Sequence, residues 1–235
     1  MVHGISFYAP YIEKNPVLPE EESTHAIRVS RLKEGDEVNI TNGKGFFFRA
    51  IITHAHPKHC GVNIIEILPQ TPLWHFRLHI AIAPTKNIAR MEWLVEKATE
   101  IGVDNISFLS CQHSERREIK TDRLEKIMIN AMKQSQKAWM PQLTGMIALK
   151  DFISQPIIGT KYIAHCDKSK KSLLKHLYQT GENATIMVGP EGDFSTEEIT
   201  QAVAQGFQPI TLGPSRLRTE TAALAALHTI HLLNE

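Results

Sequence analysis

The stretch MVGPEGDFSTEE, residues 187–198, leads from an apolar segment through two glycines into a run of polar residues. Ser195 followed by Glu198 is the pattern of a capping box, in which each side chain bonds a free backbone N–H of the other residue at the start of a helix. Phe194 and Ile199 stand at the flanking positions that form a hydrophobic staple. We therefore expect a strand, a tightly held loop and a helix that begins just after Ser195.

The alternation of strand and helix continues on both sides of this stretch. Apolar segments alternate five times with segments whose apolar residues recur at helical spacing. Such a pattern predicts an α/β fold with a parallel sheet covered on both faces. The expected strands are 76–84, 106–110, 161–167, 185–189 and 208–213, and the expected helices are 86–103 (ending at Gly102), 121–137, 169–179, 196–205 and 219–233.

Residues 1–70 have a different pattern from the rest of the chain. Short segments rich in Val, Ile and Phe are separated by turn signals, of which Asn42-Gly43 is typical of a hairpin. These strands predict a small β-barrel or a curled sheet. The prolines within 69–72 favour a linker, so residues 71–235 are expected to form a separate α/β domain. The strands expected in the first domain are 36–40, 45–52 and 61–68.

Composition narrows the class of protein. Of the 235 residues, 42% are hydrophobic and 22% are charged, as in an ordinary globular protein. No apolar run reaches the roughly 18 residues of a membrane-spanning helix, and the N-terminus lacks a signal-peptide pattern. Three widely spaced cysteines fit a reducing compartment, so we expect a cytoplasmic protein with no membrane partner.

Charge gives only a local sign of a nucleic-acid partner. The net charge is +1, but the segment 113–137 carries seven Lys and Arg residues against four acids. This segment is either a solvated helix face with mixed charges or a surface that contacts phosphates.

Three loops follow expected strands, at the sheet edge where ligands bind in parallel sheets: 165–169, 189–195 and 213–220. In the second loop Gly189 and Gly192 permit close approach of the backbone. The lysine of a phosphate-binding loop is absent, and the carboxylates of Glu191 and Asp193 would repel a polyphosphate. The loop therefore either binds a ligand with a cationic centre or is a tight turn that binds nothing.

The third loop precedes an apolar helix and contains two arginines, Arg216 and Arg218. Thr219 could cap the helix and Glu220 could interact with its dipole, although capping does not require the arginines. The helix is apolar on more than one face, which indicates that it is deeply buried or shared with a partner subunit.

The second and third loops, with the residues that flank them, resemble motifs of a known family. VGPEGDFSTEE (188–198) and LGPSRLRTETAALAAL (212–227) resemble the signature loops of the bacterial 16S rRNA uridine-N3 methyltransferases, which belong to the SPOUT superfamily. The segment 25–52 is similar to the PUA-like RNA-binding domain of that family, and the segment 86–116 to the opening of its catalytic domain. The resemblance covers the whole chain.

The resemblance implies an S-adenosylmethionine-dependent enzyme that methylates N3 of a uridine in 16S rRNA of the small ribosomal subunit. It implies a PUA-like β-barrel that binds RNA over 1–70 and a SPOUT-like methyltransferase domain with a trefoil knot over 71–235. It also implies a homodimer and no metal. The implied cofactor contacts are Gly189, Pro190, Glu191, Gly192, Leu212, Gly213, Leu217, Arg218 and Thr219.

Two residues are candidates for the chemistry. Arg218 would stabilise the negative charge that develops on the uracil or orient the base, and Glu220 would help to hold the loop or the base. The uridine must be unpaired for its N3 edge to be reached, which suits a separate domain that grips RNA. The candidate RNA contacts are Arg28, Arg31, Arg116, Arg117 and Lys137.

The chain also departs from the family pattern. Asp193 replaces a usual glycine, Arg216 is shifted by one place, and Lys133 and Lys137 stand where a glutamate and an arginine are usual. Two other functions stay open: a SPOUT methyltransferase for another RNA or for ribose 2′-oxygens, and a non-catalytic RNA-binding protein of ribosome assembly.

Several histidines and cysteines could be mistaken for metal ligands. HAHPKHC (54–60) is expected to be a polar turn that binds metal only adventitiously. His75, His79 and Cys166 are expected to be packing residues near strands.

Overall fold

The computed structural model describes residues 6–157, 159–166 and 171–235. The chain divides into two compact units. One unit holds the residues up to Trp74 together with Ile129–Met140, and the other holds His75–Met128 and Pro141–Glu235. A segment from the middle of the sequence therefore packs with the N-terminal residues.

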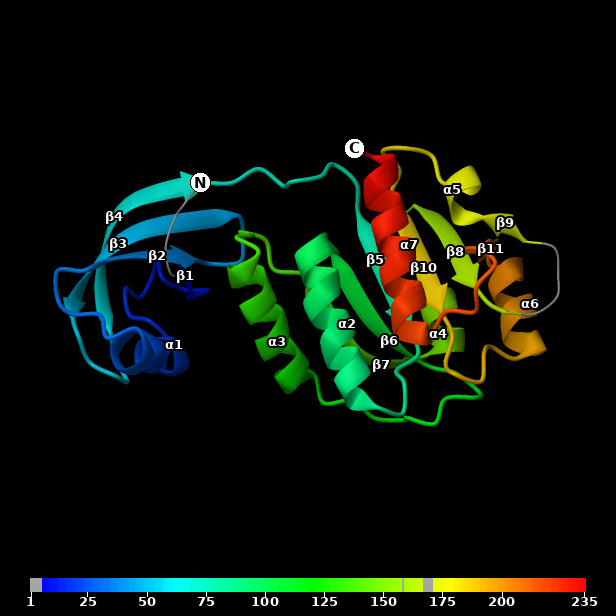
Figure 1. The fold of residues 1–235 in the computed structure, drawn as a ribbon, viewed down its shortest axis with the longest axis horizontal. Helices are drawn as coiled ribbons and strands as arrows, with labels where there is room; N and C mark the ends of the chain where they lie inside the picture. Colours follow the sequence, from blue (N-terminus) through cyan, green and yellow to red (C-terminus); the bar gives the residue numbers. More distant parts are fainter. Residues whose placement is uncertain (1–5, 158, 167–170) are drawn as a thin grey trace. The chain divides into compact units, whose positions relative to one another are not determined.

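The first unit is built on a four-stranded sheet in the order β1-β2-β3-β4 (Figure 1). β1 runs parallel to β2, and the other two pairs are antiparallel. The small sheet expected from the sequence is confirmed, but strand pairing among the described residues does not close it into a barrel, because β1 and β4 stay at its edges. The strands are β1 Ser6–Tyr8, β2 Glu37–Thr41, β3 Phe46–His54 and β4 Gly61–Pro69.

Two short helical segments of the first unit had no sequence signal. α1 (Glu20–Thr24) continues directly into the π-helix η1 (His25–Val29). Each has five residues, too few for a helical period to be recognised. They cover the apolar core of the unit, in which Phe7, Ile40 and Phe48 are fully buried.

The second unit contains a seven-stranded sheet in the order β7-β6-β5-β10-β8-β11-β9, with every pair parallel. This confirms the predicted α/β class and all five predicted strands. β7 and the two-residue β9 were not predicted. The strands are β5 Leu78–Ile82, β6 Asn105–Ser110, β7 Gln142–Ala148, β8 Thr160–Ala164, β9 Ser172–Leu173, β10 Ala184–Val188 and β11 Gln208–Thr211.

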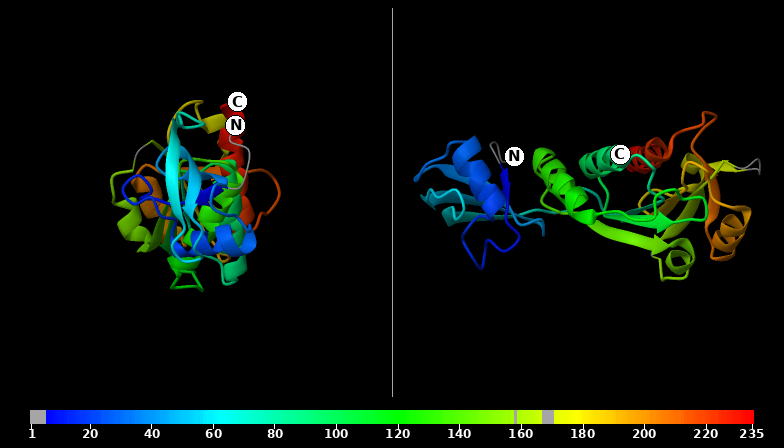
Figure 2. Two further views of the ribbon diagram at one scale, coloured as in Figure 1. Left: turned by 90° about the vertical axis from the view of Figure 1, so that its left-hand side faces the viewer. Right: turned by 90° about the horizontal axis from the view of Figure 1, so that it is seen from below.

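Helices cover both faces of this sheet. α2 and α7 pack side by side on one face, and α4 and α6 lie on the other (Figure 2). The predicted capping box of α6 is present, and Gly102 ends α2 with φ +134°. The helices are α2 Ile88–Ile101, α3 Thr121–Gln134, α4 Leu149–Ile153, α5 Leu174–Leu177, α6 Thr196–Ala204 and α7 Thr219–Leu233.

The helix predicted for 169–179 is wrong in length. Of that range the structure describes 171–179, where α5 spans only Leu174–Leu177. Ser172 and Leu173 instead form β9 beside β11, and Tyr178 is extended with ψ 133°. The apolar residues of this segment therefore serve partly as an edge strand, which a helical period could not distinguish.

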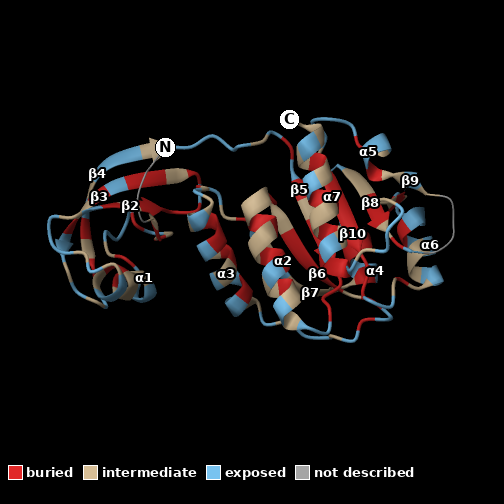
Figure 3. Ribbon diagram, viewed as in Figure 1, coloured by how far each residue is buried: buried red, intermediate tan, exposed pale blue. Residues whose placement is uncertain are grey.

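The core of the second unit is centred on β10, whose five residues are all buried (Figure 3). α7 is buried along one side, at Ala223, Ala226, Leu227 and Ile230, and leaves Leu232 half exposed. None of the described helices is both long and apolar enough to cross a bilayer. The trefoil knot stays a prediction.

His79 lies on β5 inside this packed unit, as the sequence predicted for a packing residue. Its Nε2 is 2.9 Å from the Ser107 hydroxyl, and its ring meets the edge of the Phe152 ring. Burial lowers the pKa of His79 from 6.5 to about 4. The folded state therefore binds fewer protons than the unfolded state between these two values, so the free energy of unfolding falls as pH drops through this window.

We expect this histidine to make the protein acid-sensitive. Between pH 6.5 and pH 4 the free energy of unfolding should fall by about 3 kcal/mol. His79→Asn keeps a hydrogen-bonding side chain but does not titrate, so the stability of this variant should depend less on pH. Urea unfolding of both proteins across this range measures the difference, and equal slopes of stability against pH would contradict the assignment.

Candidate functional site

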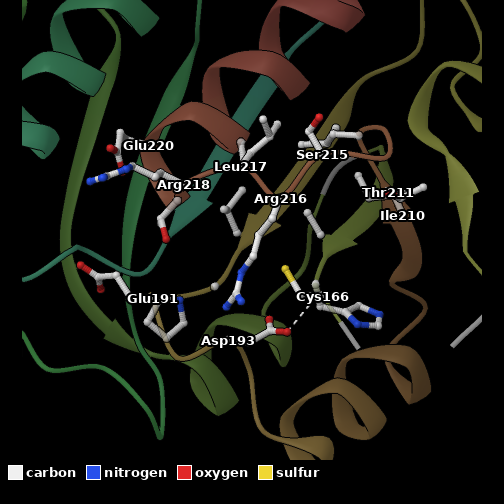
Figure 4. A pocket seen from close by; sticks show the side chains of 18 of the residues that line it. Cys166, Glu191, Asp193, Ile210, Thr211, Ser215, Arg216, Leu217, Arg218 and Glu220 are labelled. Atoms are coloured by element: carbon white, nitrogen blue, oxygen red, sulfur yellow. Dashed lines mark hydrogen bonds between the residues drawn. The ribbon is translucent and has the colours of Figure 1, made fainter. Parts of the chain in front are cut away.

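The loops after β8, β10 and β11 line a cavity of about 410 Å³ at the carboxyl edge of the sheet (Figure 4). The first turn of α7 and Arg90 of α2 complete its wall. This volume is within the range of about 300–1,000 Å³ that is typical of small-molecule sites. The cavity lies where ligands bind in parallel α/β sheets.

The structure brings most of the predicted cofactor residues together in this cavity. Eight of the nine line it: Gly189, Pro190, Glu191, Leu212, Gly213, Leu217, Arg218 and Thr219. Gly192 does not, and a Cβ added there would lie 3.0 Å from Cβ of His113. Gly192 therefore allows the loop to pack against the segment after β6. The cofactor roles of all nine stay predictions.

The chemical character of the cavity wall is mixed. Ala164, Val188 and Ile210 give apolar surface, which suits a flat heterocycle. The carboxylates of Glu191 and Asp193 give negative charge, and Arg216 extends toward Asp193 across the cavity (Figure 4). An apolar and charged wall of this kind fits S-adenosylmethionine, which has an adenine, a cationic sulfonium and a zwitterionic amino-acid end.

The 189–195 loop is held by hydrogen bonds to its neighbours. Glu191 accepts a bond of 3.1 Å from the backbone N–H of Lys86, in the loop after β5. Glu198 accepts from the N–H of Ser195 and, through its other oxygen, from the N–H of Gln112. The capping box predicted from the sequence therefore also fixes the loop after β6.

Asp193 links two of the cavity loops. Its backbone is left-handed, with φ +65°, a conformation that aspartate tolerates better than most residues. One carboxylate oxygen accepts from the N–H of Cys166 at 2.7 Å (Figure 4). The other accepts from the N–H of Phe194 at 2.9 Å. The departure from glycine therefore adds a connection between the loops after β8 and β10.

The start of α7 differs from the capping expected at Thr219. The N-cap residue is Arg218, and Thr219 is the first residue of the helix and is buried. Glu220 is only 6% exposed, and its Oε1 lies 3.6 Å from Nε of Arg90. Its Oε2 is buried and has no hydrogen-bond partner among the described residues. A carboxylate oxygen at the cavity wall therefore remains able to accept a bond.

The predicted RNA-binding residues lie in different settings. Arg28, on η1, and Arg31, with φ +56°, are exposed, as is Arg117. Arg116 donates to the carbonyl oxygens of Thr85 and Lys86, so its guanidinium supports the loop after β5. Lys137 is partly buried. The RNA contacts of all five stay predictions.

The departure at Lys133 has a structural explanation. Its Nζ lies 2.6 Å from Oε1 of Glu22, and the two side chains are only 13% and 12% exposed. The lysine thus holds the last turn of α3 against α1 within the first unit.

The lining residues that were not assigned as cofactor contacts from the sequence include Arg90, His165 and Cys166. Arg90 is about 130 positions from its partner Glu220, and nothing in the spacing relates them. His165 and Cys166 belong to the 165–169 loop that the sequence singled out, of which 167–169 lie outside the described residues. The packing role expected for Cys166 is wrong, because Cys166 is exposed at the cavity. The packing role expected for His75 is wrong as well, because His75 is exposed just before β5.

The histidines of 54–60 form a column on the surface of the first unit. The rings of His54, His56 and His59 stack in sequence, and Cys60 is buried away from them. Among the residues that the structure describes, no group of three His, Cys, Asp or Glu side chains is placed to hold a metal ion.

Comparison with known proteins assigns the chain to a family. Residues 72–231 match the RNA methyltransferase domain family, and residues 18–65 match the RNA methyltransferase PUA domain family. The chain belongs to the RNA methyltransferase family. The resemblance expected from the two C-terminal loops is therefore confirmed at the level of the family.

Individual relatives extend over nearly the whole chain. A probable rRNA-methyltransferase from Porphyromonas gingivalis is 44% identical, with a TM-score of 0.93 and coverage of 98% of both chains. A putative methyltransferase from Legionella pneumophila, solved with bound cofactor SAM, is 30% identical, with a TM-score of 0.88 and coverage of 99% of both chains. Ribosomal RNA small subunit methyltransferase E of Rickettsia conorii is 28% identical over 92% of this chain and 89% of its own.

The link made by Asp193 can be tested through the reactivity of Cys166. Asp193→Gly keeps the left-handed backbone but removes the acceptor, whereas Asp193→Asn keeps an oxygen acceptor. Without cofactor, we expect a thiol reagent to label Cys166 several-fold faster in the glycine variant and at nearly the original rate in the asparagine variant. Cys60 and Cys111 are buried and give little background. Equal labelling of the original and glycine proteins would contradict the link.

Proposed function

We propose that the protein transfers a methyl group from S-adenosylmethionine to N3 of a uridine in 16S rRNA of the small ribosomal subunit. The observation that carries this proposal is the convergence of the two signature loops on one cavity. Membership of the RNA methyltransferase family, and the bound SAM of the Legionella relative, support the same reading. We place the protein in the cytoplasm, where small subunits are assembled.

The wall of the cavity supports the choice of cofactor. When bound, S-adenosylmethionine supplies an electrophilic methyl group on a sulfonium. Backbone and apolar side chains around Gly189, Leu212 and Leu217 would hold its adenine and ribose. Glu191 and Asp193 would favour its positive charge, which also explains why a phosphate-rich cofactor does not suit this loop.

Two residues at the start of α7 are proposed to act on the uracil. Arg218 is exposed at the cavity and can offer its guanidinium to a carbonyl oxygen of the base, where negative charge accumulates as N3 loses its proton. Glu220, held near Arg90, has a buried oxygen that can accept a hydrogen bond from the loop or the base. The two side chains would therefore orient the base and stabilise its anion.

RNA and a second copy of the chain are the proposed partners. We assign RNA binding to the domain 1–70, with Arg28 and Arg31 as contacts, supported by the match to the PUA domain. Arg117 and Lys137, and Arg116 less directly, are proposed contacts from the basic segment. Half-exposed apolar side chains of α7, such as Leu232, support a homodimer that buries part of this helix.

Arg218→Ala is the most direct test of the proposed chemistry. We expect methyl transfer to small-subunit RNA to fall by about 100-fold or more, because a donor to the developing charge is lost. Arg218→Lys should restore part of the rate, since it keeps the charge but not the planar fork. Transfer of radioactive methyl groups, with cofactor affinity measured separately by calorimetry, provides the data.

The outcomes separate the proposal from its alternatives. Nearly normal turnover in Arg218→Ala would remove that residue from the chemistry. No binding of S-adenosylmethionine by the original protein would favour a non-catalytic assembly factor. A methyl group found on a ribose 2′-oxygen would instead favour the other methyltransferase class.

A further inference from the structure

An aromatic and cationic surface of the first unit has no role so far. Tyr11 is 68% exposed and Trp139 is 45% exposed, although large aromatic side chains are normally covered. Tyr11 follows β1, and Trp139 belongs to the segment Ile129–Met140 that packs with this unit. Neither residue lies within 18–65, the range that matches the PUA domain family.

Trp139 is held rigidly by backbone contacts. Its segment pairs with the turn between β2 and β3, through bonds of 2.8 Å from Gly45 N to Ala138 O and 2.9 Å from Met140 N to Gly43 O. The indole N–H donates to the carbonyl oxygen of Gln70 at 3.3 Å. The side chain is therefore fixed before any ligand arrives.

Gly45 provides the space for the indole ring. A Cβ added at Gly45 would lie only 2.3 Å from the ring of Trp139, so any other residue would displace the ring. Gly45 also has φ +94°, which favours glycine. The indole thus lies directly on the backbone of the turn, and nearly half of the Trp139 surface remains open to solvent.

Lys44 connects the two aromatic residues. Its backbone forms a bridge with Trp139, and its ammonium lies 4.8 Å from the centre of the Tyr11 ring. The ammonium also donates to the carbonyl oxygen of Pro10 at 3.1 Å and forms no salt bridge within the described residues. A positive charge without a salt-bridge partner in the described part of the chain therefore lies over the exposed ring of Tyr11, on a residue whose backbone pairs with that of Trp139.

We propose that Tyr11, Lys44 and Trp139 form a platform on which unpaired bases of the RNA substrate stack. Aromatic side chains accept any base through its π-face, and a neighbouring lysine can contact the phosphate backbone. A rigid platform loses little conformational entropy on binding. The inference rests on the proposed action on RNA. It assigns to Trp139 and Tyr11 the stacking of bases, which the basic residues proposed as RNA contacts do not provide.

RNA is favoured over a protein partner by the charge of the surface. The core of a protein–protein interface is depleted of charged residues. An ammonium over an exposed aromatic ring, without a salt-bridge partner among the residues described, instead matches a polyanion with unpaired bases. The platform should therefore affect the Michaelis constant for RNA and leave cofactor binding unchanged.

Trp139→Ala and Tyr11→Ala test the platform by RNA affinity. With an unstructured, uridine-rich oligonucleotide of about ten nucleotides and with unmethylated small subunits, we expect each variant to bind about 5- to 100-fold more weakly, the effect of losing one stacked base. Trp139→Phe keeps a stacking ring and should retain most of the affinity. Trp93→Ala, which removes another half-exposed tryptophan, is the matched control and should bind as the original protein does.

Further readouts exclude a merely structural effect. The affinity for S-adenosylmethionine and the melting temperature of Tyr11→Ala should be unchanged, because this side chain is largely exposed. Methylation by the variants should show a raised Michaelis constant for RNA with nearly normal turnover at saturating RNA. Salt should weaken the binding of Lys44→Ala less steeply than that of the original protein, since one phosphate contact is lost.

The platform and the proposed function fail in different ways. Unchanged RNA affinity in Trp139→Ala and Tyr11→Ala would overturn the platform while methyl transfer by the original protein stands. Loss of self-association in these variants, measured by sedimentation, with RNA affinity intact would show a protein contact instead and would also overturn it. RNA binding that depends on Trp139, in a protein that never binds S-adenosylmethionine, would support the platform and remove the proposed function.

Discussion

Carboxylates that accept hydrogen bonds from backbone N–H groups hold the functional edge of the second unit together. Loops after parallel strands have no ladder to satisfy these N–H groups, and hydrogen bonds to a charged acceptor are stronger than those between neutral groups. Side-chain acceptors solve this problem and at the same time set the spacing of the loops. The bonds run from Gln112 to Glu198 at 2.8 Å, from Lys86 to Glu191 at 3.1 Å and from Cys166 to Asp193 at 2.7 Å.

These bonds fix the shape of the cavity through residues of the chain itself. The loop after β10 is tied to the loops after β5, β6 and β8, and its helix begins at a capping box. A cavity whose loops are tied to one another in this way needs little ordering of the chain on binding, so more of the interaction energy is available for affinity. The same acids that fix the loops also make the cavity unsuitable for a polyphosphate.

Local signals in the sequence were sufficient for much of the fold and the site. The pattern around Ser195 and Glu198 gave the helix start, and the two glycine-containing loops gave most of the cavity wall. Contacts between residues far apart in the sequence could not be predicted from such local signals. Arg90 reaches Glu220 across the fold, and Trp139 packs on Gly45 in a unit that begins far earlier in the chain. Short elements such as α1 and β9 have too few residues to show a period.

The central claim is that this cavity supports methylation of one uridine in small-subunit rRNA. Mass spectrometry of nucleosides from small subunits, incubated with the protein and S-adenosylmethionine, tests it most directly. We expect one new N3-methyluridine per subunit, which disappears when either the protein or the cofactor is omitted. Unmodified uridine after incubation with protein that demonstrably binds the cofactor, or a methyl group on any other atom, would contradict it.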